Sequence, residues 1–196
     1  MPVIELQSTD FTRVASGSFA SEPEPSIYIV DSILAGSTSG TGSLKVSFSG
    51  NPSIRWIVGN PPITFGSNIR IGIAVKILDV SSGASVWRVR AGIFIGNNRA
   101  GIEVQYALGN LYYHLFFHTA TMLITPNYFE QIILRQETVS ALSYFSFSNQ
   151  NTKNLVSTIT YGLIDSGQAG FFLEGSSITH GTVLFDYFFI EEYIGA

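Results

Sequence analysis

The sequence predicts an all-β protein that folds as a two-sheet antiparallel β-sandwich. Three observations support this: apolar residues alternate with polar ones at a period of two, Gly- and Pro-rich turns separate the segments, and amphipathic helical patterns are lacking. Many short strands joined by tight turns pack as two layers or as a barrel. The only weak helical signal is at residues 127–131, directly after Pro126.

The clearest strand patterns lie in the middle of the chain. Residues 69–77 place Ile or Val at every second position, and residues 86–95 do the same with Trp87 and aliphatic residues. Arg88 and Arg90 fall on the opposite face of the latter segment. Shorter runs with the same alternation occur at residues 44–48 and 54–58. We expect each of these segments to be a half-buried strand.

Turn residues recur at regular intervals between these strands. The segment Leu108-Gly109-Asn110-Leu111 joins two apolar runs, and its Gly-Asn link predicts a two-residue type II′ hairpin. The whole chain yields roughly a dozen to fifteen strands by this criterion. Because no linker-like segment or repeat divides it, we expect residues 1–196 to form a single domain.

Composition excludes several classes of function. The formal charge is −4 and the predicted pI is about 5.3, so we expect no nucleic-acid partner. The chain has no Cys, which excludes thiolate catalysis, disulfides and Cys-ligated zinc. Charged residues make up only 12% of the chain, about half the usual share. A protein with so few charges and with strands that are apolar on both faces is expected to self-associate.

No targeting or membrane-spanning segment is evident. The start of the chain lacks the basic and apolar regions of a signal peptide. The longest uncharged run, residues 104–129, is interrupted by Gly109, two His residues and Pro126, so we expect no membrane span. Together with the expected self-association, these features favour a virion component or another protein of an extracellular surface.

Two motifs in the second half of the chain point to a known family. The first motif is Ser166-Gly-Gln-Ala-Gly-Phe-Phe-Leu-Glu-Gly. The second is the closing segment Gly181-Thr-Val-Leu-Phe-Asp-Tyr-Phe-Phe-Ile. Together with the strands before them, over about residues 85–193, they resemble the concanavalin A-like lectin/glucanase superfamily, especially the C-terminal accessory modules of β-xylosidases. The resemblance implies a concanavalin A-like jelly roll with one concave face, on which some members bind or cleave glycans.

The resemblance also implies a candidate metal position. Some members hold a structural calcium ion near the terminal strands, and Asp186 in the closing motif is the one residue that matches such a position. Tyr187 stands where a second acidic residue often occurs. A calcium site needs several converging oxygen ligands, so Asp186 alone does not establish it. We expect no other cofactor.

Catalytic groups are not evident in the sequence. Glycoside hydrolysis needs two carboxylates close together, and the paired acids at residues 22–24 and 191–192 lie in a Pro-rich loop or point to opposite faces of a strand. His114 and His118 share one face of a strand but lie about 13 Å apart, too far to bind one metal ion. We therefore expect a protein without enzymatic activity.

Aromatic residues form the more informative group. Glycan-binding sites use flat rings against sugar faces, together with donors that bind hydroxyl groups. In residues 111–119 both faces of the strand are aromatic, which suggests that one face is core and that a ligand, a loop or a partner covers the other. The predicted carbohydrate-binding residues are Tyr106, Tyr112, Tyr113 and Tyr144, with Arg88 and Arg90 as donors.

Taken together, the sequence predicts a non-enzymatic carbohydrate-binding or structural module. We expect it to be a homo-oligomeric subunit of a virion or surface assembly. Two alternatives remain open at this stage. One is a glucanase-like glycoside hydrolase, and the other is an assembly subunit that binds no ligand.

Overall fold

The computed structural model describes residues 3–9, 19–22, 28–31, 43–58, 63–66, 69–117, 120–123, 132–139, 142–149, 154–161 and 166–193. These residues form sixteen strands and no helix, which confirms the predicted all-β class. The weak helical signal at residues 127–131 lies outside the described residues. In the part of the chain that the structure describes, no helix has the length and hydropathy needed to cross a membrane.

The strands form two sheets, and every pairing among the described residues is antiparallel. The first sheet has the order β14-β13-β12-β7-β16-β4-β3, and β1 pairs with β16 beyond the end of β4. Its strands are β1 (Val3–Thr9), β3 (Tyr28–Asp31), β4 (Ser43–Ser49), β7 (Ile69–Ser81), β12 (Ile132–Val139), β13 (Leu142–Asn149), β14 (Asn154–Tyr161) and β16 (His180–Tyr193).

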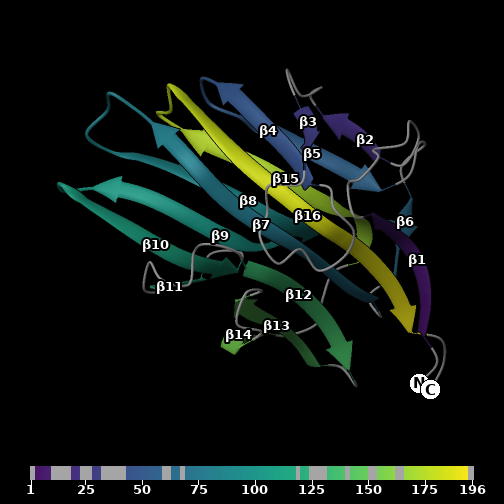
Figure 1. The fold of residues 1–196 in the computed structure, drawn as a ribbon. Helices are drawn as coiled ribbons and strands as arrows, with labels where there is room; N and C mark the ends of the chain where they lie inside the picture. The colour runs from purple at the N-terminus through teal and green to yellow at the C-terminus, as the bar shows by residue number, and fades with distance from the viewer. Residues whose placement is uncertain are drawn as a thin grey trace.

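The second sheet has the order β11-β10-β9-β8-β15-β5-β2, with β6 paired to one end of β15. Its strands are β2 (Phe19–Glu22), β5 (Ser53–Val58), β6 (Thr64–Phe65), β8 (Trp87–Ile95), β9 (Asn98–Ala107), β10 (Asn110–Phe117), β11 (Ala120–Leu123) and β15 (Gly167–Ser176). In Figure 1 the long strands β16 and β7 of the first sheet lie across β15 and β8 of the second.

The hydrophobic core lies between the two sheets. Phe171 on β15 packs against Phe185 and Phe188 on β16, with ring centroids 5.1 and 5.4 Å apart. Trp56 on β5 stacks on Phe171 and meets the edge of Phe185. The contacts of Phe185 and Phe188 with Trp56 and Phe171 join the two sheets. Burial of such large rings is a major contribution to folding.

The alternation read from the sequence predicts which residues enter this core. On β7 the side chains of Ile71, Ile73 and Val75 are fully buried in it. On β8 the alternating residues from Val89 to Ile95 are buried in the same core, while Arg90 lies on the opposite face. The strict alternation fails on β16, where the register against β7 shifts between Asp186 and Phe189. This irregularity lets Phe185 and Phe188, three positions apart, both face the core.

The β9–β10 hairpin corrects the predicted turn by one residue. Its two central residues are Leu108 and Gly109, and both have positive φ angles, 53° and 80°. Two positive φ values define a type I′ turn rather than the expected type II′ turn at Gly109-Asn110. Leu108 is 89% exposed in a left-handed conformation that disfavours branched and bulky side chains.

Two glycines allow strands β8 and β9 to pair closely. Gly92 and Gly101 are direct register partners. A Cβ atom on Gly101 would lie 2.2 Å from the carbonyl oxygen of Ala91, and one on Gly92 would lie 2.0 Å from that of Ala100. The backbone of a central strand cannot move away from such a contact without breaking the sheet. Only glycine therefore fits at either position.

We predict that Gly101→Ala destabilises the protein by about 3 kcal/mol, the upper end of the usual range for overpacking a core. The reason is the contact with the Ala91 carbonyl group. Gly83→Ala is the matched control, because a Cβ at Gly83 meets nothing within 4 Å. Urea unfolding of both variants provides the test. Equal stabilities would show that β8 and β9 pair less closely than described.

Candidate functional site

The candidate site is on the outer face of the second sheet, the face turned away from the core. Strand register places its residues in rows that run across β10, β9, β8 and β15. Three rows matter: an apolar row that contains Gly92 and Gly101, an ionic row that contains Glu103, and a more open row that contains Arg88.

The apolar row is covered by aromatic rings that meet above the glycine pair. Phe116 on β10 and Phe172 on β15 stand at the two ends of the row that contains Gly101 and Gly92. Their strands are three steps apart, about 14 Å, yet the two ring centroids are only 6.1 Å apart. The rings can approach because the two intervening positions have no side chains. Ile57 and Phe94 are buried together with these two rings, and the four residues form the outer cluster.

Arginine side chains lie over three rings of the outer cluster. Their guanidinium carbons are 4.0 to 5.4 Å from the ring centroids: Arg55 over Phe94, Arg90 over Phe116, and Arg99 over Phe172. Such cation–π contacts contribute roughly 0.5–2 kcal/mol each, depending on desolvation. The sequence suggested that a ligand, a loop or a partner covers the aromatic face at Phe116, and the structure shows that Arg90 of the same chain lies there.

The ionic row holds two of these arginines, Arg90 and Arg99, in place. Glu103 has only 4% of its side chain exposed, and its Oε2 atom accepts a hydrogen bond from Nε of Arg90. Glu174 on β15 accepts a hydrogen bond from Arg99 at 2.6 Å and lies 3.6 Å from a terminal nitrogen of Arg90. Nδ1 of His114 is 3.2 Å from the second oxygen of Glu103, a contact that is an ion pair when the imidazole is protonated.

The third row is the accessible part of the outer face. It runs from Tyr112 through Gln105 and Arg88 to Ser176, each the direct register partner of the next. Tyr112, Gln105 and Ser176 are half-buried, and Arg88 is exposed. The Tyr112 ring lies nearly parallel to that of His114, 6.2 Å away. An aromatic ring, an amide, a guanidinium group and a hydroxyl group therefore follow one another across four strands.

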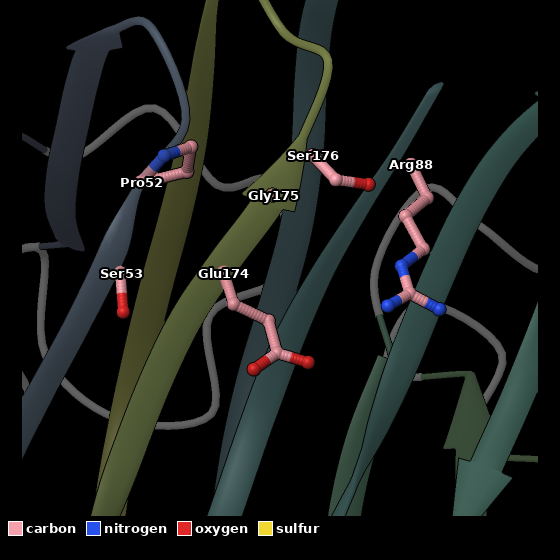
Figure 2. Close-up of a pocket in the computed structure, with 6 residues that line it drawn as sticks. All are labelled: Pro52, Ser53, Arg88, Glu174, Gly175 and Ser176. Carbon is pink, nitrogen blue, oxygen red and sulfur yellow. The ribbon is translucent and has the colours of Figure 1, made fainter. Parts of the chain in front are cut away.

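A pocket of about 220 Å³ lies at the β15 end of this row. It is lined by Pro52, Ser53, Arg88, Glu174, Gly175 and Ser176. Figure 2 shows Arg88 on one side of the pocket and the carboxylate of Glu174 and the hydroxyl group of Ser176 on the other. A hydrogen bond of 2.9 Å from Gly175 N to Pro52 O joins two of the lining residues. Among the described residues, Arg88 has no ion-pair partner, and its side chain lines this pocket.

The structure separates the residues predicted to bind carbohydrate. Tyr112, Arg88 and Arg90 share the outer face, but the ion pairs and the Phe116 ring already engage Arg90. Tyr113 is on the core side of β10 and packs against the core. Tyr106 is on the same side of β9, where it stacks on Trp87. The predicted set is thus not one continuous platform.

The remaining predicted residues belong to the first sheet. Tyr144 is on β13 and Asp186 is on β16, and the side chains of both lie outside the described residues. Among the residues whose side chains the structure describes, no three His, Asp or Glu side chains come close enough to hold a metal ion. Calcium binding by Asp186 stays a prediction.

Sequence reasoning did not identify Gln105 and Ser176 as members of the open row. Both were hidden by the strand register, because Gln105 faces Tyr112 only when the hairpin turns at Leu108-Gly109. A turn one residue later would pair Tyr112 with Ala107. The sequence carries no signal for this register, because type I′ turns favour Asn, Asp or Gly at the position that Leu108 occupies.

Comparisons with known proteins show the fold. No protein-family model matches the sequence, and no curated protein sequence matches it. Among solved structures, the chain is similar to the CBM2 module of the evolved Dit of Lactobacillus casei BL23 phage J-1. The TM-score is 0.54 and the sequence identity is 11%. The match covers 97% of this chain and 96% of that chain. Lectin II from Ulex europaeus gives a TM-score of 0.51 and 10% identity over 97% of this chain and 100% of that chain.

An engineered GH43 glycoside hydrolase with endo-xylanase and exo-arabinofuranosidase activity gives a TM-score of 0.58 and 13% identity. The match covers 95% of this chain but only 41% of that enzyme. These similarities confirm the predicted concanavalin A-like sandwich fold. At identities this low they show the fold alone.

We predict that Glu103→Gln lowers the free energy of unfolding by about 3 kcal/mol, because it leaves Arg90 without its buried partner. Glu174→Gln is the comparison, since the Glu174 side chain is 29% exposed and water can replace its contacts. Its cost is expected to be about 1 kcal/mol or less. Chemical denaturation measures both, and a larger loss in Glu174→Gln would contradict the assignment of Glu103 as the central acceptor.

Proposed function

We propose that the open row on the outer face of the second sheet binds carbohydrate. The observation that carries this proposal is the alignment of Tyr112, Gln105, Arg88 and Ser176 in a single register row. An aromatic ring packs against the apolar face of a sugar, and the three polar groups that follow bind hydroxyl groups. The row spans about 14 Å, enough for a short oligosaccharide to lie across the strands.

Charge favours an acidic glycan at this site. Three arginines, at positions 88, 90 and 99, lie on the outer face near the two carboxylates Glu103 and Glu174. Ion pairs account for Arg90 and Arg99, whereas Arg88 is exposed beside the pocket. A carboxylate or phosphate group of the glycan would form a charge-assisted hydrogen bond with its guanidinium group.

Similar proteins support a role in carbohydrate binding. The phage CBM2 module matches almost from end to end on both chains, and a plant lectin does so as well. The solved structures also include the catalytic domain of a laminarinase, with a TM-score of 0.52, so the fold alone does not separate a binding protein from an enzyme. The choice between these two functions depends on the carboxylates of the face itself.

We propose that the protein has no glycoside hydrolase activity. The usual mechanisms need two carboxylates that both reach the glycosidic bond or its attacking water. On the described outer face the carboxylates are Glu103 and Glu174, and Glu103 has only 4% of its side chain exposed. Its oxygens contact Arg90 and His114. A substrate on the surface would therefore reach Glu174 and not Glu103.

We predict that Arg88→Ala and Tyr112→Ala each weaken glycan binding by about tenfold or more, because they remove the donor and the ring of the same row. A glycan array identifies the ligand, and titration calorimetry then gives the dissociation constants. Binding is expected to weaken as salt rises from 50 to 500 mM, since an exposed ion pair is screened.

Lys76→Ala serves as the control, because it removes the same charge from β7 of the other sheet. Its affinity should equal that of the wild-type protein. The proposal is wrong if no glycan binds, or if Arg88→Ala and Tyr112→Ala both bind as the wild-type protein does. Release of reducing sugar from a polysaccharide panel would instead support the hydrolase alternative.

We propose further that the protein acts as a subunit of a homo-oligomeric virion or surface assembly. The end of the second sheet carries three exposed apolar side chains: Val86, Leu108 and Leu111. Leu108 combines 89% exposure with a left-handed backbone, a position where Asn or Gly would be less strained. A second copy in contact with the Leu108 turn would account for an apolar residue there. The match to a phage module over nearly its whole length supports the virion setting.

We predict that the wild-type protein is oligomeric in solution and that Leu108→Asn shifts it toward the monomer. Asn tolerates the left-handed conformation of this turn and removes the exposed apolar side chain. Multi-angle light scattering across a concentration series measures the mass. Asn97→Ser, in the turn at the opposite end of β9, is the control and should leave the mass unchanged. A wild-type mass of 21.3 kDa at every concentration would refute the assembly role.

A further inference from the structure

A second hollow lies at the end of the sandwich where the chain crosses from one sheet to the other. It has a volume of about 580 Å³, within the usual range for a small-molecule site. Its lining comes from the end of β7, the β7–β8 loop, the start of β8 and the end of β9. We call it the end groove, and its residues are Val80, Ser81, Ser82, Gly83, Ala84, Ser85, Trp87 and Tyr106.

Aromatic side chains form one wall of the end groove. Trp87 and Tyr106 are register partners on β8 and β9, and their rings are nearly parallel, 13° apart in plane with centroids 5.9 Å apart. Trp87 packs on the edge of the core, and both residues remain partly exposed. The two rings pack against each other, and the core anchors Trp87 from below. A partly exposed aromatic ring of this kind can stack against the apolar face of a sugar ring.

The opposite wall is a loop fixed by hydrogen bonds. The hydroxyl group of Ser82 donates to the carbonyl oxygen of Ser177 and accepts a 3.0 Å hydrogen bond from the backbone N–H of Ala84. The carbonyl oxygen of Ser81 accepts a 2.9 Å bond from Thr179 N. These contacts tie the β7–β8 loop to the neighbouring β15–β16 loop. The groove is thus preformed, and a ligand would not have to order this wall.

The lining indicates the class of ligand. None of the eight residues is charged, and four of them, three serines and a tyrosine, carry hydroxyl groups. A neutral sugar has an apolar ring face and hydroxyl groups around its rim. The aromatic rings of the groove suit the apolar face, and the hydroxyl-bearing residues suit the rim. We infer that the end groove binds a neutral oligosaccharide, with one pyranose ring stacked on Trp87.

This site is separate from the open row on the outer face. Trp87 and Arg88 are consecutive on β8, so their side chains point to opposite faces of the second sheet. The lining of the end groove and that of the Arg88 pocket have no residue in common. Because the end groove lacks charged residues, its affinity should not depend on ionic strength, unlike binding at Arg88. The two sites can therefore be tested independently.

Intrinsic fluorescence provides a direct test, because the chain has only two tryptophans. Trp56 is 5% exposed and stacks on Phe171 in the core, so a bound sugar would change the emission of Trp87 alone. The probes are xylohexaose, cellohexaose and laminarihexaose, titrated at 50 and 500 mM salt. We expect at least one to change the emission, with the same dissociation constant at both salt concentrations.

Variants identify the residues responsible. Trp87→Ala should weaken binding about tenfold or more by calorimetry, whereas Trp87→Phe keeps a ring and should bind within about threefold of the wild-type protein without the fluorescence change. Arg88→Ala should bind these neutral probes normally. That result separates failure of the end groove from failure of the outer-face site.

Ala84→Arg provides a test that does not depend on the folding of Trp87→Ala. Ala84 is exposed and lines the groove, so a long side chain there should block the ligand without disturbing the core. Asn97→Arg places the same side chain at the other end of β8 and should bind normally. The inference is overturned if none of the three hexasaccharides binds, or if binding survives in both Ala84→Arg and Trp87→Ala.

Discussion

The close pairing of β8 and β9 at Gly92 and Gly101 is the constraint on which the outer face depends. Without side chains at these positions, Phe116 and Phe172 reach across two strands and meet. Arg90 lies over the first ring, and Glu103 holds that arginine from the adjacent strand. The glycine pair thus positions the rings of the apolar row. These rings in turn position Arg90 of the ionic row beside it. The outer face is therefore preorganised as far as the row that contains Arg88.

This arrangement explains why a sheet with both faces apolar still presents a polar surface at one end. Near Phe94 and Phe116 the aromatic rings are buried and the charged side chains contact rings or form ion pairs. In the next row, beyond the one that contains Glu103, Arg88 is an exposed cation beside the pocket. A ligand that binds there meets groups whose positions the neighbouring rows already determine, which lowers the entropy cost of binding.

Much of the fold could be predicted from the sequence, because alternation on β7 and β8 reports burial directly. The site was harder to predict, since it depends on which residues of different strands lie opposite each other. A turn displaced by one residue was enough to conceal the pairing of Tyr112 with Gln105. Trp87 was correctly assigned to the core side of β8, but only the structure shows that it ends in an open groove. The long-range approach of Phe116 to Phe172 has no local signal.

We propose that an acidic glycan lies along the row from Tyr112 to Ser176. Chemical-shift mapping by NMR, with the best acidic oligosaccharide from a glycan array, tests it most directly. We expect the largest shifts on the backbone amides of Gln105, Arg88 and Ser176 and on their strand neighbours. Shifts confined to the first sheet, or no shifts at a saturating concentration of the oligosaccharide, would contradict it.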